Sequence, residues 1–319
     1  MNTTEISFGI VMLFQVILGV SVNVFLLLFY TRMVSTSPKI SSSDLILGHL
    51  ALANTIILLT NATPETMSAW GLRNFLGNVG CKIFFYLYRV ARGLAICTTC
   101  LLSVFQAITI SPGTSQWAGI KAKLPKCILP SCVLSWIINL LTEFDTVMNM
   151  TGPQNGSTVR IILDLKYCSK VSKSEEIALV IATVRSLRDL SIVGLMSLAS
   201  IYIVFLLHRH HRQVQHLHGP RHSQRVMPEV RAAKRVVVLA TLYVLLYGRQ
   251  TIMLSILLNM KESAPLLVSS HMIWSPTFSV ISPFLMIQSD RRLKIFGKTE
   301  SPRVPRKLSV HPLKPTGVR

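Results

Sequence analysis

The chain has 319 residues, of which half are hydrophobic and only 14% are charged, and its mean hydropathy is +0.49. A soluble domain of this length needs more charge on its surface, so the composition excludes an ordinary soluble protein. The formal net charge of +20 is compatible with nucleic-acid binding, and the positions of the basic residues must decide that question.

Four long runs contain no Lys, Arg, Asp or Glu: 6–31, 45–64, 93–120 and 263–289. Each run can cross a bilayer, which takes about 20 residues. Three further apolar segments carry charges; alone they could be buried helices, but beside the four runs they indicate membrane helices with functional charges. The sequence predicts an all-α bundle of seven transmembrane helices within 1–290, at about 6–30, 44–63, 81–110, 125–144, 177–207, 231–258 and 266–288, and then a basic tail, 291–319, expected to be disordered.

The basic residues fix the expected orientation. With the N-terminus outside, the inner loops and tail hold 21 of the 33 Lys and Arg, and the outer segments hold 6. This positive-inside bias predicts a multi-pass plasma-membrane protein with an extracellular N-terminus and a cytoplasmic C-terminus, and it explains the charge without nucleic acid. No Lys or Arg precedes Arg32, so we expect no cleavable signal peptide. Arg291, Arg292 and Lys294 follow the last span and are expected on anionic lipid.

The outer segments carry the marks of an oxidising compartment. Glycosylation triplets begin at Asn2, Asn149 and Asn155, all placed outside. Cys81 opens the third helix from outside and Cys168 lies in the long outer loop, so we predict a disulfide between them; the alternative is two free thiols.

Five arginines and one aspartate are expected at the same depth in the outer half of the bundle, roughly 12 to 18 Å down at 1.5 Å per residue: Arg89, Arg92, Arg185, Arg188, Asp189 and Arg249. Asp189 is the only anion expected in this layer, with Glu143 close above it. One interpretation is a structural network with an Arg185–Asp189 pair at i and i+4. The other is a ligand-binding site, because unpaired buried cations ask for an anion from outside.

Catalytic and cofactor motifs are not found. There is no phosphate-binding Gly-x-x-x-x-Gly-Lys-Ser/Thr loop, no His-Glu-x-x-His and no Gly-x-Ser-x-Gly, so we expect neither an enzyme nor a cofactor. Several histidines lie in the inner loop between 208 and 222, but no Cys or carboxylate accompanies them, which argues against a metal site.

Several strings occur in order along the chain and carry a family resemblance: Asp44-Leu-Ile-Leu47, Leu50-Ala-Leu-Ala-Asn54, Pro64-Glu-Thr-Met67, Arg89-Val-Ala-Arg-Gly93, Leu102-Ser-Val-Phe-Gln-Ala-Ile-Thr-Ile-Ser-Pro112, Val214-Gln-His-Leu-His218 and Ser275-Pro-Thr-Phe278. With these strings the chain resembles the vomeronasal type-1 receptors over about nine tenths of its length. It departs from the large rhodopsin-like class, since the third helix ends in Gln106-Ala-Ile-Thr109 in place of Asp-Arg-Tyr and the seventh lacks Asn-Pro-x-x-Tyr.

The resemblance implies a G-protein-coupled pheromone receptor that signals through an inhibitory-type heterotrimeric G protein. It also implies a small-molecule ligand, and an anionic, steroid-like molecule such as a sulfated steroid suits the arginine layer. The expected G-protein-facing residues are Gln106, Thr109, Arg231, Lys234 and Arg235; the last three could instead only obey the positive-inside rule. Alternatives are a bitter-taste-like receptor, a non-signalling member of the same family, and a transporter, although no inverted repeat is found.

Overall fold

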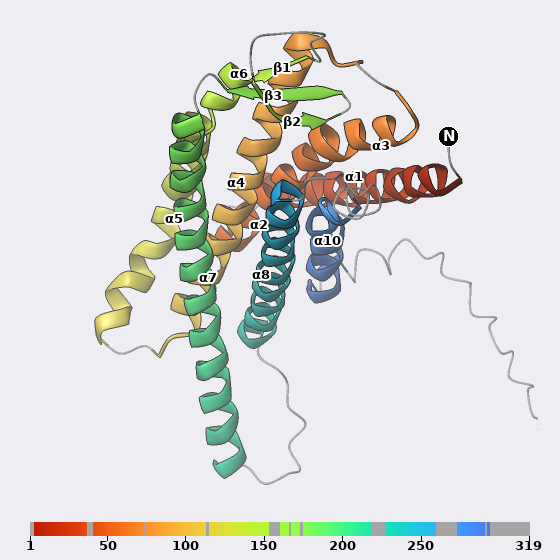
Figure 1. Ribbon diagram of the computed structural model, residues 1–319. Helices are drawn as coiled ribbons and strands as arrows, with labels where there is room; N and C mark the ends of the chain where they lie inside the picture. Colours follow the sequence, from red (N-terminus) through yellow and green to blue (C-terminus); the bar gives the residue numbers. More distant parts are fainter. Residues whose placement is uncertain are drawn as a thin grey trace, which may run out of the picture.

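The apolar runs of the sequence fold as long helices that pack side by side in a bundle (Figure 1). The described residues form seven rods, each made of one helix or of consecutive helical segments. In this computed structural model the rods are α1 (Thr3–Thr36), α2 with η1 and α3 (Ser42–Ile57, Leu58–Ala62, Thr63–Ala69), α4 (Gly77–Ile110), α5 with α6 (Ser115–Thr142, Asp145–Asn149), α7 (Glu175–Leu217), α8 (Pro228–Asn259) and α10 (Thr277–Ser289). The structure describes residues 3–36, 41–72, 75–112, 115–152, 160–165, 167–172, 175–217, 228–259, 273–290 and 292–293.

Within these described residues, five helical stretches are long and apolar enough to cross a membrane: Ile6–Thr36, Ser42–Ala69, Gly77–Ile110, Ala118–Asn149 and Leu179–His210. The α8 helix supplies a further rod of 32 residues. The described part of the last rod, α10, is shorter, with 13 residues, and the expected start of that helix lies outside the described residues. The expected tail also lies outside them, apart from Arg292 and Leu293.

The second rod is longer than the sequence predicts. The expected span ends at Thr63, because a proline and a glutamate follow it, but the helix continues through α3 to Ala69. A π-helical segment, η1, comes directly before Pro64, which sits in the first turn of α3, where a missing N–H is tolerated. As a result Glu65 lies inside the bundle and not in an outer loop.

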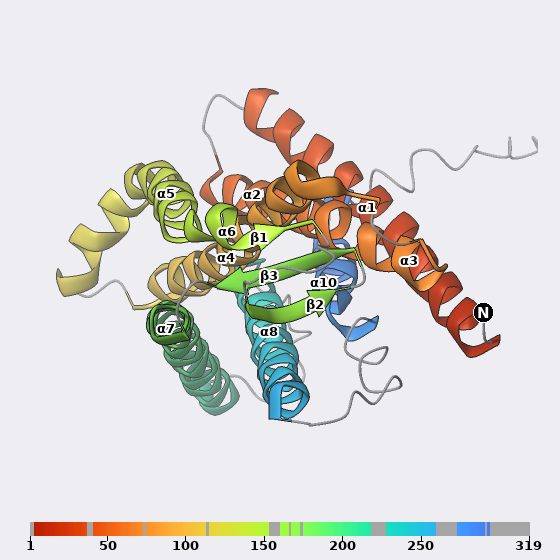
Figure 2. The same cartoon turned by 45° about the horizontal axis from the view of Figure 1, so that its top comes forward.

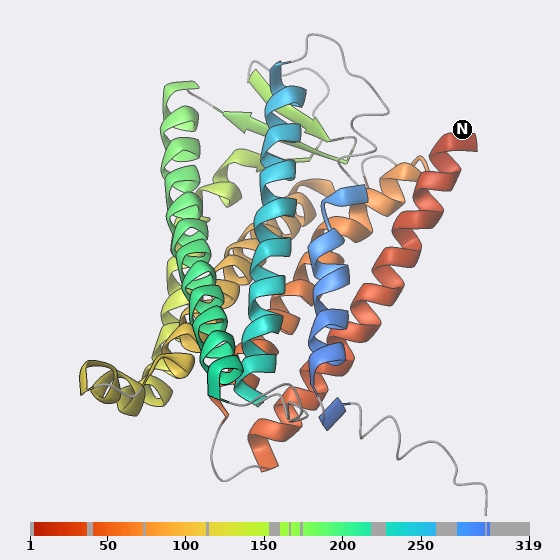
Figure 3. The same cartoon turned by 90° about the horizontal axis from the view of Figure 1, so that it is seen from below.

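A small sheet closes one end of the bundle, which we call the sheet end (Figure 2). It consists of β1 (Met150–Thr151), β2 (Arg160–Leu165) and β3 (Cys168–Ser172), antiparallel in the order β1-β3-β2. The expected disulfide is present between Cys81 at the start of α4 and Cys168 on β3. The N-terminus of α1 lies at this same end (Figure 3).

Tyr167 is buried beneath the sheet, where its ring packs against aromatic side chains at the sheet end of the bundle. Its side chain is 2% exposed and packs between Phe75 and Phe85, with ring centroids 5.9 and 6.4 Å away. Burial raises the pKa of the Tyr167 phenol, so it stays neutral. The disulfide and this aromatic stack together hold the sheet against α4.

The rods are held together by a few polar contacts and close approaches in the core. Asn23 of α1 donates to the Ser279 carbonyl (2.8 Å), and Asn54 of α2 donates to the Ser282 hydroxyl (2.9 Å), so α10 is tied to both helices. Gly93 lets α5 come close to α4, because a Cβ at that position would collide with the side-chain amide of Asn139.

At the end of the bundle opposite the sheet, Arg292 forms an ionic latch with two aspartates. Its Nη1 and Nη2 donate to the two carboxylate oxygens of Asp44 at 2.9 and 2.7 Å, and Nη2 lies 3.0 Å from Asp290. Asp44 opens α2 and Asp290 follows α10, so the latch joins these helices. These hydrogen bonds raise the pKa of the Arg292 guanidinium, which therefore remains charged. Arg292, which we expect on anionic lipid, is thus bound by carboxylates of the bundle while its side chain stays 46% exposed. Arg291 and Lys294 of the same expected cluster lie outside the described residues, so the lipid contact stays a prediction.

Replacing Arg292 with Ala should destabilise the protein, because Asp44 is 3% exposed and loses its partner. We expect a loss of about 1–3 kcal/mol, seen in detergent as a fall in Tm of roughly 2–4 °C for each kcal/mol. Arg32→Ala is the matched control, an exposed arginine on α1 for which the described residues show no ion pair. The double exchange Asp44→Arg with Arg292→Asp should recover part of the loss; no recovery would contradict the latch.

Candidate functional site

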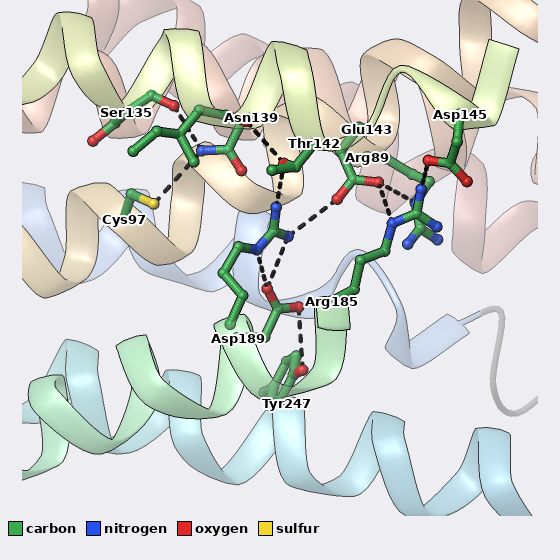
Figure 4. Close-up of polar contacts among 12 residues, drawn as sticks. Arg89, Cys97, Ser135, Asn139, Thr142, Glu143, Asp145, Arg185, Asp189 and Tyr247 are labelled. Carbon is green, nitrogen blue, oxygen red and sulfur yellow. Dashed lines mark hydrogen bonds and ion pairs between the residues drawn. The ribbon is translucent and has the colours of Figure 1, made fainter. Parts of the chain in front are cut away.

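Three of the five expected arginines lie in one partly buried cluster with three carboxylates (Figure 4). This charge cluster consists of Arg89 of α4, Glu143 and Asp145 at the ends of α5 and α6, and Arg185, Arg188 and Asp189 of α7.

Glu143 is the centre of the cluster. Its Oε2 accepts from Nε of Arg89 at 2.7 Å and lies 3.2 Å from Nε of Arg185, and its Oε1 accepts from Arg188 at 3.1 Å. The Glu143 side chain is 2% exposed, so these guanidinium groups replace the water that a carboxylate needs. One side chain thus joins α5 to both α4 and α7.

Asp145 and Asp189 supply the two further negative charges of the cluster. Arg185 also pairs with Asp145, and Arg188 pairs with its neighbour Asp189 at 2.9 Å. The expectation that Asp189 is the only anion in this layer is wrong. Because α5 ends at Thr142, the turn into α6 brings the carboxylates of Glu143 and Asp145 to the same depth as the arginines. The expected Arg185–Asp189 pair is also wrong, since Asp189 pairs with Arg188. Three guanidinium groups face three carboxylates, so this part of the layer needs no external anion.

Arg92 and Arg249 lie apart from the charge cluster and contact aromatic rings. The Arg92 guanidinium carbon is 5.2 Å from the centre of the Tyr247 ring, and that of Arg249 is 4.5 Å from the Trp274 ring. A cation–π contact attracts a cation but brings no negative charge to neutralise it. Arg92 makes no direct ion pair among the described residues and feels the Asp189 carboxylate only at longer range, so the electrostatic reason to expect an anionic ligand is stronger for Arg92 than for the three arginines of the charge cluster.

A cavity lies beside Arg92 in the middle of the bundle. It has a volume of about 40 Å³ and is lined by α4, α8 and the last rod, with Tyr88, Arg92, Tyr247, Gln250 and Ser275 among its walls. A water molecule needs roughly 10–15 Å³ of such space, whereas drug-sized ligands occupy pockets of roughly 300–1,000 Å³. The structure therefore shows a closed site that a larger ligand must open.

Tyr247 connects this cavity to the charge cluster. Its ring lies under Arg92, and its hydroxyl donates to Oδ2 of Asp189 at 3.3 Å (Figure 4). Asp189 is in turn held by Arg188. A group that displaces Tyr247 in order to reach Arg92 must therefore loosen a contact of α8 with α7.

A second cavity, of about 410 Å³, opens at the end opposite the sheet between α4, α7 and α8. Among the expected G-protein-facing residues, Thr109 lines it, Lys234 is exposed, and Arg231 is half-buried. Gln106 is 3% exposed and points into the core, so it does not reach a partner surface in this state. Arg235 is half-buried, and its Nε is enclosed without a hydrogen-bond partner among the described residues.

Other expected sites fall partly outside the described residues. Asn149 ends α6 at the sheet end, while Asn2 and Asn155 lie outside the described residues. No group of three or more metal-ligating side chains occurs in the part of the chain that the structure describes. Sequence reasoning missed Asp145, Tyr247 and Glu65 as polar elements of the site. The signals were present, as two acidic residues within three positions at the end of the fourth span and a glutamate directly after Pro64.

Comparisons with known proteins agree on one family. A model of the vomeronasal organ pheromone receptor family matches residues 6–299. The chain is 36% identical to olfactory receptor class A-like protein 1 of Danio rerio over 90% of each chain. It is also 36% identical to vomeronasal type-1 receptor 4 of Homo sapiens, over 86% of this chain and 92% of that one.

Among solved structures, squid rhodopsin has a similar fold. The TM-score is 0.71 at 14% identity, and the match covers 94% of this chain and 86% of that chain. At this identity the likeness shows the seven-helix fold and nothing about the ligand.

Replacing Glu143 with Leu should destabilise the protein strongly, because three partly buried guanidinium groups lose the buried carboxylate that they share. We expect about 3–5 kcal/mol, the usual result of removing one partner from a buried ion pair. The control is Glu176→Leu, at an exposed position near the start of α7. Thermal unfolding in detergent measures both; equal Tm values for the two variants would show that the charge cluster does not hold the helices.

Proposed function

The chain belongs to the vomeronasal organ pheromone receptor family, and from this premise we propose that it binds an anionic, lipophilic small molecule beside Arg92 and signals through an inhibitory-type G protein. The family assignment and the rhodopsin-like fold establish that the protein is a G-protein-coupled chemosensory receptor and not an enzyme. They also establish that it spans the plasma membrane several times. The ligand, the type of G protein and the orientation are the proposal.

The distribution of charge supports an extracellular sheet end. The N-terminus of α1 lies at that end, and the sequence puts 6 Lys and Arg in the segments expected there, compared with 21 in those expected at the other end. The positive-inside rule then faces the sheet, the disulfide and Asn149 outward. We infer that the cavity beside Arg92 is reached from outside or through the outer leaflet.

The contact of Arg92 with Tyr247 is the observation that carries the ligand proposal. The guanidinium lies in the bundle over an aromatic ring, and the described residues show no direct ion pair for it; the Asp189 carboxylate interacts with it only at longer range. A sulfate or carboxylate would supply the missing charge and accept two parallel hydrogen bonds from the guanidinium. Tyr88, Tyr243 and Phe278 form an aromatic wall that suits a rigid hydrocarbon body.

Ligand entry would be coupled to the cytoplasmic side by α8. The ligand must enlarge a cavity of about 40 Å³, and Tyr247 on α8 occupies one wall of it. Displacing this ring releases its hydrogen bond to Asp189 on α7. The same helix begins near Arg231 and Lys234, beside the larger cavity at the opposite end. If α8 tilts as a rigid body, its displacement beside Arg92 also moves its cytoplasmic end. Ligand binding thereby shifts the population from the closed packing of the helices to one in which that end is displaced.

Arg92→Ala should weaken the response to a steroid sulfate by roughly 10- to 100-fold, because a hydrogen bond to a charged group contributes about 1.5–3 kcal/mol. An inhibition-of-cAMP assay in transfected cells measures the potency. Arg89→Ala is the matched control, since this arginine is bound by Glu143, and its effect should appear in surface expression. The uncharged parent steroid should be weak on the wild type and unaffected by Arg92→Ala. Equal potency of the charged and uncharged steroids on the wild type would contradict the proposal.

The cytoplasmic surface is tested by Lys234→Ala combined with Arg231→Ala. These side chains are accessible at the start of α8, so their loss should reduce G-protein activation at least severalfold while the binding of ligand is retained. Gln106→Ala is a buried comparison on α4 that should act through folding and not through coupling. Sensitivity of the signal to pertussis toxin identifies the inhibitory type. Normal coupling in a correctly inserted double variant would assign these residues to membrane topology alone.

A further inference from the structure

Glu65 is a carboxyl group inside the bundle that the charge cluster does not use. It lies on α3, and the residue is 6% exposed. One of its oxygens, Oε2, is buried and has no hydrogen-bond partner among the described residues. Ser68, one turn further along the same helix, has a buried hydroxyl in the same condition. Unsatisfied polar groups at this depth are costly, so their presence in a membrane helix points to a role other than packing.

A chain of polar side chains leads from Glu65 to the cavity beside Arg92. Asn61 lies within hydrogen-bonding reach of the Glu65 carboxyl and also donates to Oγ of Ser275 at 3.4 Å. Gln250 of α8 lies 3.5 Å from the same Ser275 oxygen. Ser275 and Gln250 both line the cavity. Asn61 and Ser275 therefore link the Glu65 carboxyl to one wall of the cavity.

Glu65 also lies near Tyr167, the buried tyrosine beneath the sheet. Tyr167 is close enough to Glu65 and Tyr88 to interact electrostatically with both. Tyr88 is itself a wall of the cavity. Tyr88 and Tyr167 thus form a second connection between the cavity and the neighbourhood of Glu65.

The backbone at this point is also irregular. Five residues, Leu58–Ala62, form the π-helical segment that precedes α3 and contains Asn61. Such segments occur often at functional sites, because the extra residue in the turn redirects the side chains that follow. Without this shift the helix would present a different face to α10. The local geometry thus turns Asn61 toward Ser275 and Glu65 into the bundle.

We propose that Glu65 is the second polar anchor of the ligand site and accepts a hydrogen bond from a hydroxyl or ammonium group of the ligand. This proposal rests on the proposed function, in which Arg92 binds the anionic end. The ligand class is then an amphiphile with an anion at one end and a hydrogen-bond donor at the other. When the ligand enters and the cavity widens, its donor meets the carboxyl oxygen that lacks a partner among the described residues of the closed receptor.

A ligand-free experiment tests the premise that Oε2 of Glu65 lacks a partner in the closed receptor. Replacing an unsatisfied buried polar group with an apolar side chain of similar size removes a cost and stabilises the fold. We therefore expect Glu65→Leu to raise the Tm of the unliganded receptor in detergent by ~2 °C or more. The matched control is Glu143→Leu, a buried glutamate that arginines satisfy, whose Tm should fall. A fall of Tm for Glu65→Leu would overturn the proposal, because it would make Glu65 a structural residue.

The ligand experiment uses three steroid sulfates with one ring skeleton that differ at the end opposite the sulfate, which carries a hydroxyl, an amine or hydrogen. On the wild type the hydroxyl or the amine should improve potency over hydrogen by about tenfold, the worth of one good hydrogen bond. Glu65→Leu should abolish this preference, whereas Arg92→Ala should weaken all three compounds and keep it. Glu65→Gln separates the two donors, since the amide oxygen still accepts from a hydroxyl but no longer neutralises an ammonium.

The outcomes distinguish the two proposals. If Arg92→Ala weakens all three sulfates while Glu65→Leu leaves their ranking unchanged, the second anchor is overturned and the proposed anion site stands. If none of the sulfates activates or stabilises the wild type, the proposed ligand class fails and the second anchor fails with it. Loss of the preference in Glu65→Leu, at normal surface expression, supports the assignment.

Discussion

Burying a charge in a membrane is expensive, and this constraint organises the whole receptor. Glu143 satisfies it for three arginines at once and thereby ties α5 to α4 and α7. Arg292 satisfies it for Asp44 at the other end of the bundle. Because these groups neutralise one another, we propose Arg92 and Glu65, which lie outside these pairs, as the positions that bind a ligand.

The same constraint decides how much of the fold can be predicted from the sequence. Uncharged runs mark the spans directly, and the positions of Cys81 and Cys168 predict their disulfide. The sequence does not show that the chain turns at Thr142 and brings Glu143 and Asp145 into the arginine layer, because depth counted along a straight helix places them above it. Pairing across helices depends on such turns and not on spacing within one helix.

The site itself could be predicted only in part. All five arginines stood out as charges in apolar segments, but their partners distinguish structure from function, and the partners come from other helices. Glu65 was missed because a proline normally ends a helix, whereas here the π-helical segment before Pro64 lets it continue. The sheet was also missed, since its short strands follow no strong hydrophobic alternation. A local irregularity and a loop conformation are tertiary effects that single-sequence patterns do not encode.

The proposed activation depends on the difference between the paired charges, such as Glu143 with its arginines, and Arg92, which makes no direct ion pair among the described residues. The satisfied pairs hold the resting helices, and Tyr247 is the point at which the cavity meets them. A ligand that binds Arg92 and displaces this ring competes with a resting contact, so its binding energy is spent on moving α8. Under the proposed function, the receptor would recognise the charge of a lipophilic ligand at a depth where an unpaired charge is costly.

The most direct measurement is an infrared difference spectrum of the purified receptor with and without a steroid sulfate, recorded in the carboxyl region. We expect ligand binding to change a carboxyl band that Glu65→Gln removes. Glu143→Gln should leave this band in place, because the Glu143 carboxylate keeps its arginines in both states. A band that disappears in Glu143→Gln and persists in Glu65→Gln would contradict this division of roles, since the satisfied charges would then be the ones that respond to the ligand.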